Sequence, residues 1–506
     1  MRIYADQTVE NLAAPHVKHR VLDPDPSSRS TCRRITKWLE ECTSSHSKCS
    51  FSKPSKLPTR VLDVSPPDVL GGLRLHITGD GESGTYVALS YCWGSSQKVM
   101  TTVRNLEKHK KRIKESSLPK TIRDAVRVTR SLGVRFLWVD ALCIVQDSIN
   151  GEDWHRECST MSDVYSNAFL TISAEVAKDS AEGFLDQRTH WAANPSLQKP
   201  YHQETGQECG SVYFVDHALY SYYEESWPSA RAWAFQERRL SRRVLDYREY
   251  QISLSCKTGI YEETESKLSE TYYQAGSRPM LFSSLHAEDV LQEWYKSVED
   301  YSQRDLTFEA DKLPALSGYA HMIQKHVGGA YLAGIWKCDL LIGLLWHLST
   351  TRFRLRKPSQ QRAPSWSWAA LDGSITYNRF WVEYGKQRKP SDLWLKAIEV
   401  QVKPRGSDSM GQVLAGTLKA SSHLKRAMWL EPEKGAVSCR RNDFLSYSDV
   451  ENWNMDYFMW IDWDVPRRME AKLAVGPLDI DSIVLLLSSS LFIHHCFGVF
   501  CMIRTI

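Results

Sequence analysis

Strand patterns alternate with helix patterns through the middle of this chain, and this alternation constrains the fold more than any other feature. Residues 86–91, 134–140 and 169–174 are apolar runs of strand length. Between them, residues 118–133 and 152–168 carry apolar side chains at helical spacing. Strands joined by helices form parallel sheets, whose strands are apolar enough to be buried on both faces. The sequence therefore predicts an α/β domain with a mainly parallel sheet.

The rest of the chain divides into segments that differ in their predicted secondary structure. Residues 1–85 predict a lead-in with a short helix and a hairpin, followed by the α/β domain at residues 86–240. Residues 241–375 predict a mainly helical extension, and residues 376–506 predict a β-rich C-terminal region. The last two segments together form an α+β extension of the α/β domain.

The amino-acid composition limits the classes of partner and the cellular compartment that we expect for this protein. The chain has 64 Lys and Arg against 60 Asp and Glu, a net charge of +4 that is too small to indicate nucleic acid as a partner. Its 12 cysteines are spread over 506 residues rather than packed into a small disulfide framework. Residues 1–6 also lack the apolar run of a signal peptide. We therefore expect a cytoplasmic protein with free thiols.

One apolar stretch near the C-terminus leaves two interpretations open. Residues 483–503 are just long enough to span a bilayer as a tail anchor. However, a serine run at 488–490 and Gly498 divide the stretch into runs of strand length. We interpret it as two buried strands and expect no membrane partner.

Polar and aromatic side chains follow two of the predicted strands, at the edge where an open α/β sheet binds its ligands. The candidate binding residues at these strand ends are Ser90, Tyr91, Trp93, Gly94, Asp140 and Gln146. A structural interpretation is also open, in which Asp140 caps the following turn and Gln146 satisfies backbone groups. The spacing by itself specifies no reaction.

Glu157 lies three residues after Trp154 on the second predicted helix, so the two side chains are neighbours on its surface. A carboxylate beside a large aromatic ring can recognise a ribose hydroxyl or stabilise an oxocarbenium-like centre. The alternative is a solvated glutamate in the first turns of a helix, where the helix dipole favours negative charge.

Two further motifs have simple alternatives. Residues 79–84 fit the spacing G-x-G-x-x-G, but a strand rather than a helix follows them, which favours a glycine-rich hairpin over a dinucleotide site. Cys143 and His155 are a candidate nucleophile pair. With 12 Cys and 16 His in the chain, such a pair also arises by chance.

Three candidate zinc ligands follow one another near the N-terminus. Cys42, His46 and Cys49 are spaced closely, and Cys32 could supply a fourth ligand. The spacings match no common zinc finger, and the alternative is a thiol-rich helix end. The sequence therefore assigns no metal site.

Several blocks of the chain together resemble the fungal heterokaryon incompatibility (HET) domain family. The blocks are residues 86–94 (YVALSYCWG), 118–125 (LPKTIRDA), 137–147 (LWVDALCIVQD), 154–157 (WHRE), 161–165 (MSDVY) and 231–238 (RAWAFQER). Residues 304–315 (RDLTFEADKLPA) and 363–373 (APSWSWAALDG) resemble the region that usually follows the domain. The likeness covers about residues 34–375, with the HET domain itself at residues 86–240.

The resemblance implies a flavodoxin-like sheet, distantly similar to Toll/interleukin-1 receptor (TIR) domains. Many TIR domains cleave NAD with a helix glutamate in a Trp-Cys-x-x-Glu setting, which Trp154 and Glu157 resemble with one residue fewer. Under this analogy Glu157 is the catalytic residue and no cofactor is required, because NAD is the substrate. Trp154 and the six strand-end candidates would line the NAD site.

The resemblance also implies a function in fungal non-self recognition and regulated cell death, with self-association and an unidentified activating protein as partners. Three hypotheses stay open: an NAD glycohydrolase, a non-enzymatic signalling module that oligomerises, and an accessory enzyme of a secondary-metabolite pathway. The sequence shows no repeat of 20–50 residues and no P-loop. It therefore contains no recognisable solenoid sensor or nucleotide switch.

Overall fold

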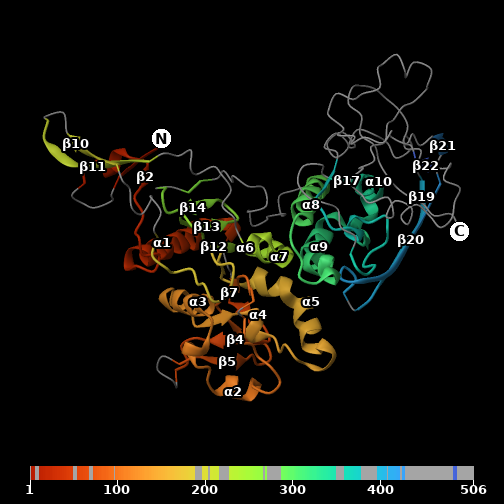
Figure 1. The fold of residues 1–506 in the computed structure, drawn as a ribbon, viewed down its shortest axis with the longest axis horizontal. Coiled ribbons are helices and arrows are strands. Elements are labelled where there is room, and N and C mark those ends of the chain that lie inside the picture. The colour runs from red at the N-terminus through yellow and green to blue at the C-terminus, as the bar shows by residue number, and fades with distance from the viewer. Residues whose placement is uncertain are drawn as a thin grey trace, which may run out of the picture. The chain divides into compact units, whose positions relative to one another are not determined.

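The computed structural model describes most of the 506-residue chain. The described residues are 2–5, 11–49, 54–67, 72–95, 97–188, 197–202, 206–215, 227–265, 268–269, 286–348, 358–377, 396–406, 408–421, 424–427 and 483–486. They belong to two compact units, Met1–Ser284 and Leu285–Ile506 (Figure 1). The predicted internal boundaries near residues 85, 240 and 375 stay predictions.

An eight-stranded sheet forms the core of the first unit. Its spatial order is β14 (Ile260–Glu262), β13 (Ile252–Cys256), β12 (Arg243–Tyr247), β9 (Leu170–Ser173), β7 (Tyr86–Ser90), β8 (Phe136–Trp138), β4 (Arg60–Asp63) and β5 (Arg74–Ile77). The four central strands pair in parallel, and antiparallel strands complete both edges. Every residue of β7, β9 and β12 is buried. The predicted α/β class with a parallel sheet is therefore confirmed for this unit.

The parallel strands follow a particular order. Taken along the chain they are β7, β8, β9 and β12, and across the sheet they run in the order 2-1-3-4. Flavodoxin-like sheets arrange their first four strands in this order and bind ligands where it reverses, between strands 1 and 3. Here that point lies between β7 and β9, but the next strand, β13, is antiparallel to β12. The flavodoxin-like and TIR-like assignments stay predictions.

Helices alternate with these strands as the sequence predicts. The helices of the first unit are α1 (Arg29–Ser45), α2 (Leu106–Lys111), α3 (Lys120–Ser131), α4 (Asp140–Cys143), α5 (Glu152–Asn167), α6 (Trp227–Ala230) and α7 (Ala232–Leu240). The Ser28 hydroxyl caps α1 by accepting the backbone N–H of Thr31. After α3, Gly133 adopts a φ of +70°, the left-handed conformation that ends many helices.

The glycine-rich segment at residues 79–84 differs from the prediction in one respect. It leads into the strand β7, so it does not form a dinucleotide site. However, β5 pairs with β4, and β6 (Ser83–Gly84) pairs with β3 (Ser55–Lys56). The expected hairpin across these glycines is therefore wrong, because each flanking strand finds its partner earlier in the chain.

A second, four-stranded sheet lies in the first unit. Its spatial order is β10 (Leu197–His202), β11 (Glu208–Val215), β1 (Arg2–Ala5) and β2 (His19–Arg20). Its strand β1 pairs antiparallel with β11, more than 200 positions later in the chain. The described N-terminal strand is thus part of a sheet.

The second unit packs two helices against short strands. Its helices are α8 (Ala287–Ser302), α9 (Pro314–Val327) and α10 (Leu340–Gly343). Its strands pair as β15 (Tyr331–Leu332) with β16 (Ile335–Trp336), β17 (Trp346–Leu348) with β18 (Ile375–Tyr377), β19 (Lys396–Pro404) with β20 (Val413–Ser421), and β21 (Leu424–Ala427) with β22 (Ile483–Leu486). Three fully buried tryptophans, Trp294, Trp336 and Trp368, occupy its core.

Part of the apolar C-terminal stretch is described. Residues 483–486 form the strand β22, in agreement with the strand interpretation, and residues 487–503 lie outside the described residues. Across the described part of the chain, none of the helices is both long and apolar enough for a membrane span.

Candidate functional site

The carboxyl ends of β7 and β8 bring four candidate binding residues together. Trp93, which follows β7, donates its indole Nε1–H to Oδ2 of Asp140, which follows β8, over 2.8 Å. Gln146 donates its side-chain N–H to the backbone oxygen of Asp140 over 3.1 Å. The Tyr91 hydroxyl, which donates to Oε1 of Gln97 over 3.2 Å, lies near the Asp140 carboxylate. Adjacent parallel strands place their carboxyl ends at one edge of the sheet, which explains this convergence.

The hydrogen bonds of these residues support the structural interpretation. Besides the Trp93 indole, the Asp140 carboxylate accepts the backbone N–H of Ala141 over 2.6 Å. Gln146 also donates to the backbone oxygen of Ile144 over 3.2 Å. Trp93, Asp140 and Gln146 are each half-buried, so they retain contact with solvent. These side chains shape the strand ends, and their binding role stays a prediction.

Gly94 contributes through its backbone. Its φ is +62°, and a Cβ there would lie 2.1 Å from Oδ2 of Asp179. The backbone N–H of the next residue, Ser95, donates to the same oxygen over 2.8 Å. Only glycine therefore fits where the loop after β7 closes against Asp179.

Two further residues belong to this cluster, and the sequence did not single them out as site residues. They lie at the start of α7 and within it. Arg231, which precedes α7, donates from Nη1 to the backbone oxygen of Tyr91. Glu237, within α7, is buried near the Ser90 side chain. The Arg231 charge acts on both Asp140 and Glu237. We call Ser90, Tyr91, Trp93, Asp140, Gln146, Arg231 and Glu237 the strand-end cluster.

Burial shifts the acid groups of the strand-end cluster. It raises the pKa of Glu237 to about 7, although the Arg231 charge and the Ser90 hydroxyl oppose that shift. It also raises the pKa of Asp140, against the opposing effects of Arg231 and the Trp93 indole. A carboxyl group with a pKa near neutrality can both take up and release a proton at physiological pH. Perturbed groups of this kind gather at functional sites.

Trp154 lies on α5 and is half-buried. Its ring meets that of Trp233, on α7, edge to face with centroids 6.2 Å apart. Trp233 is also half-buried and follows Arg231 by two positions. The pair therefore offers aromatic surface beside the segment that carries Arg231.

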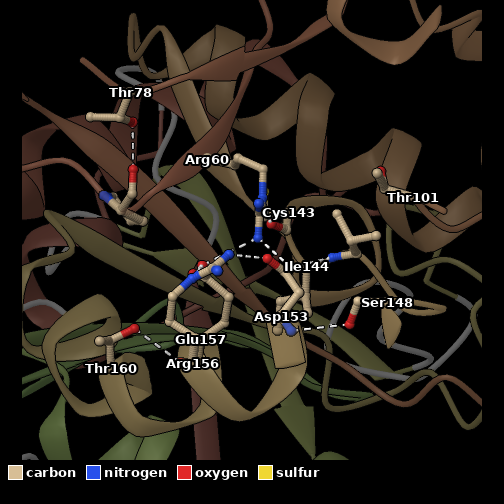
Figure 2. A network of polar contacts seen from close by, with 12 residues as sticks. Arg60, Thr78, Thr101, Cys143, Ile144, Ser148, Asp153, Arg156, Glu157 and Thr160 are labelled. Atoms are coloured by element: carbon tan, nitrogen blue, oxygen red, sulfur yellow. Dashed lines mark hydrogen bonds and ion pairs between the residues drawn. The ribbon is translucent and has the colours of Figure 1, made fainter. Parts of the chain in front are cut away.

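Glu157 lies in a separate network around Arg60 of β4 (Figure 2). Its Oε1 lies 3.2 Å from Nη2 of Arg60 and 3.3 Å from Nε of Arg156. Arg60 also pairs with Asp153 and donates to the backbone oxygen of Cys143. Burial raises the pKa of Glu157, and the Arg60 charge opposes this shift. We call Arg60, Asp153, Arg156 and Glu157 the Arg60 network.

The burial of Glu157 corrects one expectation. Only 3% of the residue is exposed, so the interpretation of a solvated first-turn glutamate is wrong. The hydrogen-bonding partners of Glu157 and those of Asp140 belong to different sets of residues. The catalytic assignment of Glu157 stays a prediction, and this carboxylate is reached only if the Arg60 network opens.

The thiol of Cys143 is buried. Its Sγ accepts the backbone N–H of Val139 over 3.4 Å, and burial raises its pKa to about 12. His155 is exposed on α5. A nucleophilic cysteine needs its thiolate form, which this environment disfavours.

A local signal could have found Glu237. Residues 236–239 (QERR) are four consecutive polar residues, and all four are buried in α7. Because buried charged groups need partners, such a run within a helix indicates a polar network. Arg60 carries no comparable signal, since its partners lie more than 80 positions away.

Comparison with known proteins agrees with the motif blocks. Residues 86–237 match the family model described as heterokaryon incompatibility protein (HET). Neither the curated proteins nor the solved structures include a match to the chain. The matched residues begin with β7 and end at Glu237, so they contain every member of the strand-end cluster. The chain therefore contains a HET domain, at residues 86–237.

Proposed function

We propose that this protein acts in fungal non-self recognition and regulated cell death, and that its HET domain does so by cleaving NAD. The HET family match supports the first part. One observation carries the second: Asp140 and Glu237, both with raised pKa values, lie around Arg231 at the carboxyl ends of the parallel strands. Open α/β sheets bind nucleotides at this edge.

The cluster contains the groups that such a reaction needs. The half-buried Trp93 ring and Asp140 carboxylate face the ligand, and Asp140 holds a ribose hydroxyl. The bond between ribose C1′ and the nicotinamide nitrogen breaks, and nicotinamide leaves with the electron pair. Water then attacks C1′, which completes ADP-ribose. Glu237 accepts the proton released by the water, directly or through Asp140, because its pKa is about 7.

Glu157 has a positioning role in this proposal. With Arg60 it holds the segment that follows Asp140, because Arg60 donates to the backbone oxygen of Cys143. The competing assignment places Glu157 itself on the ribose, in analogy with the TIR glutamate. The two assignments predict different variant kinetics.

The test is nicotinamide release from NAD by the purified full-length chain, alone and under forced clustering. We expect Asp140→Asn and Glu237→Gln each to lower turnover by about 100-fold or more, on the scale of a lost acid–base group. Asp163→Asn, an exposed change on the same helix as Glu157, serves as the matched control. Glu157→Gln should raise KM more than it lowers kcat, since a positioning residue acts through others.

Each outcome has a distinct meaning. Turnover that survives Asp140→Asn and Glu237→Gln but disappears in Glu157→Gln would move the catalytic role to Glu157. No nicotinamide release in either state would contradict NAD cleavage and favour the non-enzymatic signalling module. Toxicity of the intact chain in fungal cells, measured with the same variants, tests the cell-death role separately.

A further inference from the structure

Four metal-binding side chains meet in the first unit, outside the strand-end cluster. Cys42 lies near the end of α1, His46 follows that helix, Cys49 ends a short 3-10 helix (Ser47–Cys49), and Cys256 ends β13. Their ligand atoms all lie within 4.8 Å of one another. The three cysteines are buried and His46 is half-buried. We call these four residues the Cys3His cluster.

The spacing of the Cys3His cluster suits a tetrahedral ion. In a zinc site with Zn–S bonds of about 2.3 Å, neighbouring ligand atoms lie roughly 3.8 Å apart. Here Sγ of Cys256 lies 3.5 Å from Nδ1 of His46, and the remaining pairs fall below the 4.8 Å limit. Only a small closure is therefore needed for all four atoms to share one ion.

The surroundings orient the histidine. Nδ1 of His46 faces Cys256, while Nε2 lies 3.4 Å from the hydroxyl of Tyr261. The Tyr261 ring also stacks on the His46 ring, with centroids 6.1 Å apart. Metal-bound histidines commonly donate their other ring N–H to an oxygen in this way, which fixes the tautomer and leaves the ligating nitrogen free of a proton.

A buried arginine complements the charge of a metal-bound cluster. Three thiolates and one neutral imidazole around Zn²⁺ carry a net charge of −1. The fully buried Arg243 donates from Nε to Sγ of Cys42 over 3.2 Å and from Nη2 to the backbone oxygen of Cys49 over 2.6 Å. Its guanidinium lies against the Cys42 sulfur and offsets the excess negative charge of the metal-bound cluster.

We propose that Cys42, His46, Cys49 and Cys256 bind a structural zinc ion. Thiolate and imidazole ligands in tetrahedral arrangement select Zn²⁺, and four protein ligands leave no open position for substrate. The ion joins α1 to β13 across 210 positions of the chain and so brackets the HET domain match at residues 86–237. Linking such distant segments removes conformational freedom from the unfolded chain.

The structure also identifies which cysteine is the fourth ligand. Cys32, the sequence-based candidate, lies near the start of α1 and directs its Sγ to the backbone oxygen of Ser27, 3.7 Å away. Cys256 takes its place because β13 runs back towards the end of α1. Cys32→Ser is therefore a matched control on the same helix that carries Cys42.

The test is the metal content of the full-length chain, measured by elemental mass spectrometry. The protein is purified under reducing conditions and without chelators. We expect about one zinc per chain, retained in Cys32→Ser and reduced at least tenfold in Cys256→Ser and Cys49→Ser. X-ray absorption of the unsubstituted protein should show three sulfur ligands and one nitrogen ligand, with Zn–S near 2.3 Å. This second measurement needs no variant to fold.

Three results would overturn the proposal. The first is a folded unsubstituted chain that holds no stoichiometric zinc and takes up none when Zn²⁺ is added. The second is zinc that Cys256→Ser retains in full. The third is a disulfide between two of the three cysteines, found by peptide mapping of the protein as purified.

Discussion

Two arginine–carboxylate groups involve α7, and the pKa of the carboxyl group is shifted in opposite directions in the two. Arg238 hydrogen-bonds with both Glu175 and Asp246. Burial acts to raise the pKa of Glu175, but the charges of Arg238 and Arg248 outweigh burial and keep this pKa below its ordinary value. Arg231 instead donates a hydrogen bond to the backbone oxygen of Tyr91, and the pKa of the neighbouring Glu237 rises to about 7.

The comparison separates structural charge from charge available for chemistry. A carboxylate in direct contact with a guanidinium stays ionised at neutral pH and serves mainly to hold the fold together. A carboxyl group that is buried with weaker compensation changes its protonation near neutral pH. On one short helix, then, Arg238 belongs to a structural group and Glu237 to a titrating one.

Replacing each arginine in turn tests this distinction with the largest expected effect on stability. Arg238→Met leaves two buried carboxylates without the arginine that hydrogen-bonds to both, although Arg248 still lies 3.7 Å from Asp246. We expect a loss of about 3–5 kcal/mol in the free energy of unfolding. Arg231→Met should cost less, because protonation of Glu237 relieves the uncompensated charge. Urea unfolding at pH 7 measures both; equal losses would contradict the distinction.

The pH dependence of stability should differ in sign between the two glutamates. The folded pKa of Glu237, about 7, lies above its unfolded value, so its contribution is complete below about pH 4 and is lost as pH rises to 7. Between pH 5 and pH 8 the unsubstituted chain should lose roughly 2–3 kcal/mol relative to Glu237→Gln.

Glu175 should behave in the opposite way. Its folded pKa is lowered, so its contribution is present above the unfolded pKa and is lost as pH falls through the folded pKa. The unsubstituted chain should therefore lose stability relative to Glu175→Gln on acidification below about pH 4. Unfolding curves at several pH values measure both profiles, and parallel profiles for the two variants would refute the assignment.

The smallest expected effect concerns the Arg60 network. Glu157→Gln removes one of its two buried carboxylates while Asp153 still pairs with Arg60. We expect a loss of about 1–3 kcal/mol, on the scale of a disrupted buried charged hydrogen bond. Asp163→Asn, exposed on the same helix, should stay within about 0.5 kcal/mol. A Glu157→Gln variant as stable as that control would mean that the network contributes little to the fold.

Much of the first unit follows from local patterns. The alternation of apolar strands and amphipathic helices predicts the parallel sheet, because a strand buried on both faces is a continuous apolar run and a helix buried along one stripe has apolar residues about every 3.6 positions. The residues after the strands follow from the same argument, and Trp93, Asp140 and Gln146 do meet there. The hairpin at residues 79–84 fails because strand pairing depends on partners elsewhere in the chain.

The sequence by itself thus determined the α/β class, the strand ends where polar groups gather, and the motif blocks of the HET family. Only the tertiary structure decided which charges meet: Glu157 with Arg60, Glu237 with Arg231, and Cys256 with the Cys42 and Cys49 pair. The physical reason is range. Secondary structure leaves a period of two or about 3.6 residues, whereas an ion pair or a ligand set joins side chains at any separation along the chain.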